Sequence, residues 1–151
     1  MTSLPRLVRR AVLARLKADT GLTAIVPAGS IHPVAVVGSG GTGGPQWPFI
    51  KLGALGTLRL RAACVNGGRV TVDVHAFAKP RYDNAGAMIE TAEDHASRIG
   101  AAIEAALSDR HLTLEGGADA RITLDDIRLM QDAEPDAFHW FAQVTARVLA
   151  A

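Results

Sequence analysis

The sequence is poor in several residue types, and each shortage narrows what the chain can be. A single cysteine, Cys64, cannot form an intrachain disulfide, so the chain does not need an oxidising compartment. Phe, Trp and Tyr make up only 5% of the residues, which predicts a core of small side chains. No apolar run approaches the roughly 20 residues of a membrane span, and we expect no membrane partner. The formal net charge is +1, so we expect no strong overall electrostatic attraction to nucleic acid.

The length and the apolar content indicate one domain. The chain has 151 residues, of which 48% are hydrophobic, and no linker or internal repeat divides residues 1–151. A core of small side chains buries little area per residue, so we expect subunit association to add stability. The basic first 22 residues lack the uninterrupted apolar stretch of a secretory signal. A mitochondrial transit peptide is the less favoured alternative to an ordinary first helix.

Two segments show helical periodicity. The first predicted helix is Leu4–Ala18, with Ser3 as N-cap and Gly21 marking its end. The second is longer, and its apolar stripe begins at Met88 and ends at Leu107. Its predicted cap is Asp83 or Asn84, and its alanine-rich face permits close packing on a sheet.

Period-two alternation predicts strands on both sides of the long helix. Phe49–Leu55 and Val70–Ala78 are expected to form a hairpin, with a turn at Asn66-Gly67-Gly68 and an extended tip around Arg59–Arg69. After the long helix, a strand through residues 122–129 changes phase at Asp125-Asp126, which indicates a β-bulge. The remaining expected segments are a turn at Ala133–Asp136, a strand Phe138–Val148, and short strands at Val34–Val37 and Leu112–Leu114.

This order of elements predicts an α+β fold. We expect a mainly antiparallel sheet of about four strands, with the N-terminal helix and the long helix packed on one face.

A glycine-rich segment could suggest a nucleotide site. Gly38–Gly43 fits G-x-G-x-x-G literally, but Pro45 and Pro48 follow where a helix must begin, so a flexible loop is favoured. The alternative function is a small α+β enzyme or ligand-binding domain with its site near Gly38–Trp47.

The remaining candidates for chemistry form no complete pattern. The five histidines match no metal motif, and His75 and His139 are expected on the outward side of their strands. A cluster of His75, His139 and Asp73 stays open as a less favoured alternative. Asp125 and Asp126 could form a carboxylate pair only through the bulge. We therefore expect no enzyme activity, and no catalytic, cofactor or metal site.

Three arginines near the predicted hairpin tip are the charges of most interest. Arg59, Arg61 and Arg69 have no acidic residue among them. They form either a solvated hairpin or an arm that contacts another subunit, and direct DNA contact is less favoured. If the arm contacts a copy of the chain, the long helix offers acidic partners at Glu90, Glu93, Asp94 and Glu104, of which Glu90 and Asp94 are the selected interface candidates. Trp47 is a further candidate interface residue.

The order of these segments resembles the phage tail completion family, which includes tail terminators of tailed phages and gene transfer agents. The resemblance spans nearly the whole chain and rests on diffuse, mostly structural motifs. These are Leu13-x-x-Leu16, Leu22–Val26, Ile31-His32-Pro33, Pro48–Gly53, Val70–Phe77 and Asp136–Trp140. The segment Gly38–Gln46 is longer and richer in glycine than the family pattern, which affects the expected shape of this loop.

The resemblance implies a structural virion protein made in the bacterial cytoplasm. It implies a homo-oligomeric ring, of six subunits, at the head-proximal end of the tail tube. Such a ring would stop tube polymerisation, contact the tail tube protein, and receive a head-tail stopper or adaptor protein. DNA would pass through its lumen without sequence-specific binding.

Overall fold

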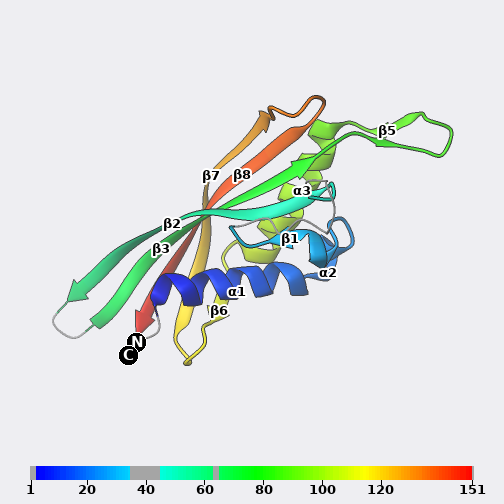
Figure 1. The fold of residues 1–151 in the computed structure, drawn as a ribbon. Helices are drawn as coiled ribbons and strands as arrows, with labels where there is room; N and C mark the ends of the chain where they lie inside the picture. The colour runs from blue at the N-terminus through cyan, green and yellow to red at the C-terminus, as the bar shows by residue number, and fades with distance from the viewer. Residues whose placement is uncertain (1–2, 35–44, 63–64, 151) are drawn as a thin grey trace.

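The computed structural model describes residues 3–34, 45–62 and 65–150 of the chain; side chains at 60–66 and 150 lie outside this description. A curled six-stranded sheet carries two main helices on one face (Figure 1). The strand order is β1-β2-β3-β8-β7-β6, antiparallel except for the β1–β2 pair. The elements are α1 (Leu4–Ala18), α2 (Thr20–Thr23), η1 (Ala28–Ser30), β1 (Ile31–His32), β2 (Phe49–Ala62), β3 (Val65–Ala78), β4 (Arg81–Tyr82), β5 (Met88–Glu90), α3 (Ala92–Leu107), β6 (His111–Thr113), β7 (Asp119–Gln131) and β8 (Phe138–Ala150).

The sheet extends the predicted four strands by two short ones. The four expected strands correspond to β2, β3, β7 and β8, while β1 and β6 add one short strand at each edge. The expected strand Val34–Val37 is not the one observed: β1 ends at His32, Val34 lies in a bend, and residues 35–37 fall outside the described part.

Helix α1 has the predicted bounds because its apolar positions recur at helical spacing. Val8, Val12 and Leu16 are fully buried against the sheet. The predicted end signal at Gly21 is wrong. The chain leaves α1 at Asp19, whose carboxylate accepts a hydrogen bond from the Leu22 N–H and starts α2, which contains Gly21.

The hairpin is present, but its predicted turn is wrong. Asn66, Gly67 and Gly68 lie within β3 and pair with β2 on one side and β8 on the other. A Cβ on Gly68 would lie 2.6 Å from Cδ2 of Leu4, so glycine here permits close approach of α1. The connection between β2 and β3 falls at residues 63–64, outside the described part.

The long helix begins later than predicted. Residues 81–90 instead form a two-stranded projection, β4–β5, which we call the finger (Figure 1). Asp83 does not cap the helix: its carboxylate accepts hydrogen bonds of 2.9 Å from the N–H groups of Ala85 and Ala87 within the finger. Thr91 is the N-cap of α3, because its hydroxyl accepts from the Asp94 N–H.

The predicted bulge and strand phases are confirmed. The β7–β8 register shifts between Asp125 and Arg128, and the predicted turn at Ala133–Asp136 joins the two strands. The inward residues of the sheet pack against α1 and α3 and form the core. Among its fully buried members are Val70, Val72, Val74, Ala142, Val144, Ala146, Ile99 and Ile103.

Candidate assembly interface

The arm is the part of the β2–β3 hairpin formed by residues 55–62 and 65–71. Helix α1 packs on its inner part, at Gly68, and its outer end extends past the helices at one end of the molecule (Figure 1). Arg59 and Arg69 are exposed on it, but they face opposite ways. Arg59 pairs with Gly68, which faces α1, whereas Arg69 lies on the face without helices, which we call the open face. Arg61 is also on the arm, with its side chain outside the described part. The structure therefore brings the three predicted arginines onto one projecting element.

Strand register places two further arginines beside Arg69. Arg69 lies directly opposite Arg147 on β8, and Arg147 lies directly opposite Arg121 on β7. We call these three exposed side chains the arginine row. Directly paired residues on adjacent strands have Cβ atoms only about 4.5–5.5 Å apart. Sequence reasoning missed Arg121 and Arg147, because alternation shows that they face outward but does not show which strands pair.

The two acidic candidates have different surroundings. The Glu90 carboxylate accepts hydrogen bonds from Nε and Nη2 of Arg98, at 2.8 and 2.9 Å, and from Nη1 of Arg81 at 3.1 Å. The hydrogen bond from Arg98 is the main reason that the pKa of Glu90 falls to about 2. Asp94 is exposed in the first turn of α3 and forms no ion pair within the described residues. Glu90 therefore anchors the finger, while Asp94 is available to a partner.

Trp47 belongs to a cluster of rings on the open face. Its indole packs edge-on against Phe49, with ring centroids 5.1 Å apart, and the ammonium of Lys79 lies 4.5 Å from its centroid. Phe49 stacks on Phe77 at 4.7 Å, and Phe77 stacks on His139 at 4.3 Å. This stacking buries Phe49 and Phe77 on the face that carries no helix, while Trp47 stays half-exposed.

The structure brings together the two histidines that sequence analysis left as a less favoured cluster. Nδ1 of His75 lies 2.7 Å from Nε2 of His139, and both rings are half-buried. Burial, and then the neighbouring His75, lower the pKa of His139 to about 4. Burial, and then Lys51, lower the pKa of His75. Both rings are therefore neutral at pH 7.

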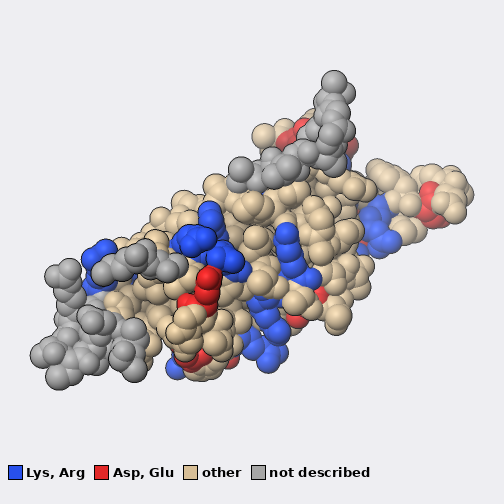
Figure 2. Space-filling model, turned by 60° about the horizontal axis from the view of Figure 1, so that its bottom comes forward, with Lys and Arg blue, Asp and Glu red and all other residues tan. Residues whose placement is uncertain are grey.

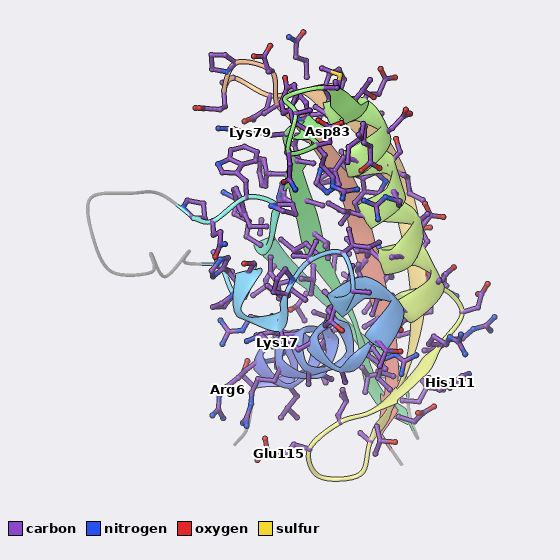
Figure 3. All side chains as sticks on the ribbon, turned by 90° about the vertical axis from the view of Figure 1, so that its right-hand side faces the viewer. Arg6, Lys17, Lys79, Asp83, His111 and Glu115 are labelled. Atoms are coloured by element: carbon purple, nitrogen blue, oxygen red, sulfur yellow. The ribbon has the colours of Figure 1, made fainter. Side chains whose placement is uncertain are left out.

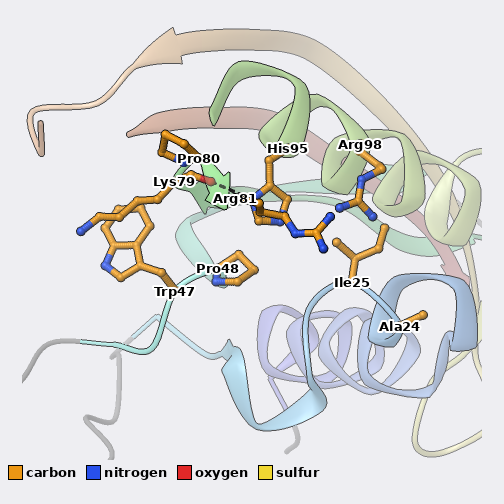
Figure 4. A pocket seen from close by; sticks show the side chains of 9 residues that line it. All are labelled: Ala24, Ile25, Trp47, Pro48, Lys79, Pro80, Arg81, His95 and Arg98. Carbon is orange, nitrogen blue, oxygen red and sulfur yellow. Dashed lines mark hydrogen bonds between the residues drawn. The ribbon is translucent and has the colours of Figure 1, made fainter. Parts of the chain in front are cut away.

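A pocket of about 310 Å³ lies beside Trp47, close to the alternative ligand site (Figure 4). Lys79, Arg81 and Arg98 contribute its positive charges, and Nδ1 of His95 donates to the Lys79 carbonyl oxygen at its edge. The two guanidiniums already bind Glu90. A second, more open hollow of about 690 Å³ is lined by Pro45, Trp47 and Lys51, among others. The glycine-rich motif Gly38–Gly43 lies outside the described residues, so the ligand-binding alternative depends on these two pockets.

The other candidate groups do not converge on a reactive centre. Asp125 accepts a hydrogen bond of 2.9 Å from the Thr145 hydroxyl, whereas Asp126 pairs with Arg128, so the bulge separates the two carboxylates. Cys64 lies outside the described part. Within the described ranges, no three His, Cys, Asp or Glu side chains are grouped to hold a metal ion. No helix in those ranges is long and apolar enough to cross a membrane.

These features describe an α+β protein with a projecting arm and finger, and comparison with known proteins assigns its family. The family model for tail completion protein gp17 matches residues 10–149, so the chain belongs to this family. It is accordingly a structural tail protein of a phage-like particle.

A solved structure gives an independent match to the fold. A chain in the virion of a native gene transfer agent particle superposes with a TM-score of 0.75 at 17% identity. The match covers 99% of this chain and 100% of that one, and at this identity it shows a shared fold. No curated protein matches the sequence.

Proposed function

We propose that this protein is a ring-forming tail terminator without catalytic activity. It caps the tail tube at the end nearest the head, stops tube polymerisation, and joins tail to head. Its partners are copies of itself in a ring of six, the tail tube protein, and a stopper or adaptor protein. Membership in the tail completion family supports this role, and a structural family argues against an enzyme.

The main support for the proposed ring is that the sheet has two edges with few strand partners. β1 pairs only with Ile50 and Lys51, so the rest of the outer edge of β2 has no strand partner among the described residues. β6 covers β7 only at 119–121, which leaves most of that edge unpaired within the same ranges. Open edges are templates for pairing with another chain. If β2 of one copy meets β7 of the next, the contact is head to tail, and such contacts generate rings when the rotation closes.

The arm gives this contact its specificity. Its outer end, beyond the contact of Leu4 with Gly68, is proposed to cross a subunit boundary, and Arg59, Arg61 and Arg69 supply planar donors that pair bidentately with carboxylates. Asp94 of a neighbouring copy is the favoured acceptor for Arg59, on the helix side of the arm, because Glu90 is already bound by two arginines. The half-exposed indole of Trp47 is proposed to contact a partner subunit.

The test removes the three arm arginines together. Changing Arg59, Arg61 and Arg69 to Ser should leave the circular dichroism spectrum and the melting curve nearly unchanged, since exposed charges contribute little to folding. It should reduce the ring population in native mass spectrometry and give unjoined or abnormally long tails in complementation. Arg6, Lys17 and Arg110, also exposed, are changed to Ser as a control of equal charge. Normal rings and tails in the arm variant would refute the role of the arm. A wild-type protein that stays monomeric would refute the ring.

A further inference from the structure

The net charge of +1 conceals a separation of charge along the sheet. Residues 49–55, 73–103 and 122–146 contain ten of the fifteen acidic residues but only five of the sixteen basic ones. The cross-strand row Thr71–Thr145–Thr123 marks the boundary between the two halves. Figure 3 places Lys79 and Asp83 at one end, and Arg6 and His111 at the other. Figure 2 shows Lys and Arg side chains gathered across the middle of the face turned toward the viewer, with acidic side chains among them.

The arginine row lies on the basic side of this boundary. Arg69, Arg147 and Arg121 occupy the paired positions next to the threonine row on the open face. Like charges directly opposite each other on neighbouring strands are unfavourable in an isolated sheet. No ion pair within the described residues relieves them.

Two acidic residues on the basic side of the boundary are already engaged elsewhere. Asp119, two positions before Arg121, binds Nδ1 of His111 at 2.6 Å, and Glu115 binds Arg10 at 2.7 Å. The row therefore presents three guanidiniums whose natural complement is a set of carboxylates or phosphates on another molecule.

The chain itself carries such a complement at the far end of the same strands. The β7–β8 turn contains Asp132, Glu134 and Asp136, all in the acidic half. Glu134 also accepts from Nζ of Lys79 at 3.3 Å, whereas Asp132 and Asp136 form no ion pair within the described residues. About ten residues of strand separate this turn from the arginine row, which corresponds to roughly 30 Å. A copy that contacts the row through its turn thus joins opposite ends of two molecules, which is the heterologous contact that a closed ring needs.

We propose that the arginine row of one subunit docks on the β7–β8 acidic turn of the next subunit. The proposal rests on the ring described above and names the surfaces that set its direction. A second copy is favoured over DNA because the opposite charge is available on the same chain, at the opposite end of the same strands.

Two complementary variants test this docking independently of the arm. The basic variant is Arg121→Glu with Arg147→Glu, and the acidic variant is Asp132→Lys with Glu134→Lys. Each variant alone brings like charges together and should need at least tenfold more protein to assemble, as measured by native mass spectrometry and sedimentation. Mixed in equal amounts, they should assemble again, because each reversed end now meets a reversed partner. Arg6→Glu with Lys17→Glu on α1 makes an equal change of charge as a control.

The possible outcomes separate the docking from the ring. Assembly of each variant at the wild-type concentration, or failure of the mixture to recover, overturns the docking even if the wild-type ring forms. A wild-type protein that stays monomeric refutes the ring. If, even then, the mixture of the two variants forms oligomers while neither variant does so alone, that result still supports the docking surfaces. A variant that fails to fold by circular dichroism is replaced by Arg121→Gln with Arg147→Gln, which should weaken assembly less than reversal does. Loss of binding to a 25-base-pair duplex, with assembly unchanged, would assign the row to DNA and overturn the proposal.

Discussion

His75 and His139 face each other across β3 and β8, with 2.7 Å between Nδ1 and Nε2, on the side of the sheet that carries no helix. In the neutral pair one ring nitrogen donates and the other accepts. Phe77 stacks on His139, so a charged imidazole would lose solvation there. The pair therefore belongs to a small aromatic cluster that favours the uncharged form of both rings.

This arrangement predicts a dependence of stability on pH. The pKa of His139 is about 4 in the fold, because of burial and then of His75, against an ordinary value of 6.5. Below pH 6.5 the unfolded chain takes up a proton that the folded chain refuses, so stability falls as the pH falls toward 4. Between pH 7.5 and 5.0 the full shift corresponds to about 2 kcal/mol. Because the ring is only half-buried, we discount this to about 1 kcal/mol, or roughly 3 °C in the melting temperature.

Thermal melts at the two pH values check this prediction. His139→Phe keeps a stacking ring and removes the titration, so its melting temperature should change less between pH 7.5 and 5.0 than that of the wild type. Gln131→Ala, at an exposed position on β7 without a titratable group, should keep the wild-type difference. Equal pH dependence in His139→Phe and the wild type would contradict the assignment.

A charge at the centre of β8 should prevent folding. Val144 is fully buried between the sheet and the helices, so Val144→Asp leaves an unpaired carboxylate in the core at a cost of several kcal/mol. Leu149 lies on the same strand but is 65% exposed, so Leu149→Asp should melt within a few degrees of the wild type. A cooperatively folded Val144→Asp protein, by circular dichroism and differential scanning calorimetry, would show that the strand phase is wrong.

Helix α3 should not tolerate a side chain at Gly100. A Cβ there would overlap the indole of Trp140, which is nearly fully buried on β8. Gly100→Ala should therefore lower the free energy of unfolding by about 1–3 kcal/mol, measured by urea denaturation. Trp140→Phe in the same chain should recover part of that loss relative to Trp140→Phe alone. Gly29→Ala has open space around its Cβ and serves as the control. Equal losses at both glycines would mean that the close packing of α3 is not responsible.

The hydrogen bonds that Glu90 accepts from Arg98 and Arg81 should hold the finger in a fixed conformation. Glu90→Gln removes the charge that holds Arg98 and Arg81, so amide exchange across residues 81–90 should become at least about tenfold faster by mass spectrometry. The overall melting temperature should change by no more than a few degrees, because the finger lies outside the core. Glu93→Gln, exposed in the first turn of α3, is the matched control. Wild-type exchange rates in Glu90→Gln would place the order of the finger elsewhere.

Several elements could be read from local patterns because local physics sets them. The bounds of α1, the alternation through β3 and β8, and the bulge at Asp125 follow from side chains that repeat with the period of one backbone geometry. The predicted turn at Asn66-Gly67 is wrong because pairing between distant strands outweighs the local signal. Its local signal favours a hairpin, but pairing with β2 and β8 on either side holds these residues in a central strand.

Some residues of the candidate interface could likewise be predicted from the sequence, and others could not. Arg59, Arg61 and Arg69 could be predicted as an interface group because they cluster in the sequence. In the fold they lie on one arm. Glu90 is predicted from the sequence as a partner of the arm arginines, but in the fold it is bound by Arg98 and Arg81. The arginine row could not be predicted from the sequence, because Arg121 and Arg147 lie 26 residues apart and only strand register makes them neighbours.

The sequence by itself determined the fold class, the family resemblance, the apolar faces of its helices and strands, and the arginines of the arm. These depend on residue type and on spacing along the chain, which short-range sterics and burial translate directly into structure. Tertiary structure alone decided which strands pair and in what register. It thereby decided that His75 meets His139 and that a near-neutral chain carries opposite charges at its two ends. Pairing between distant strands is a cooperative outcome of the whole core, and no local stretch of sequence encodes it.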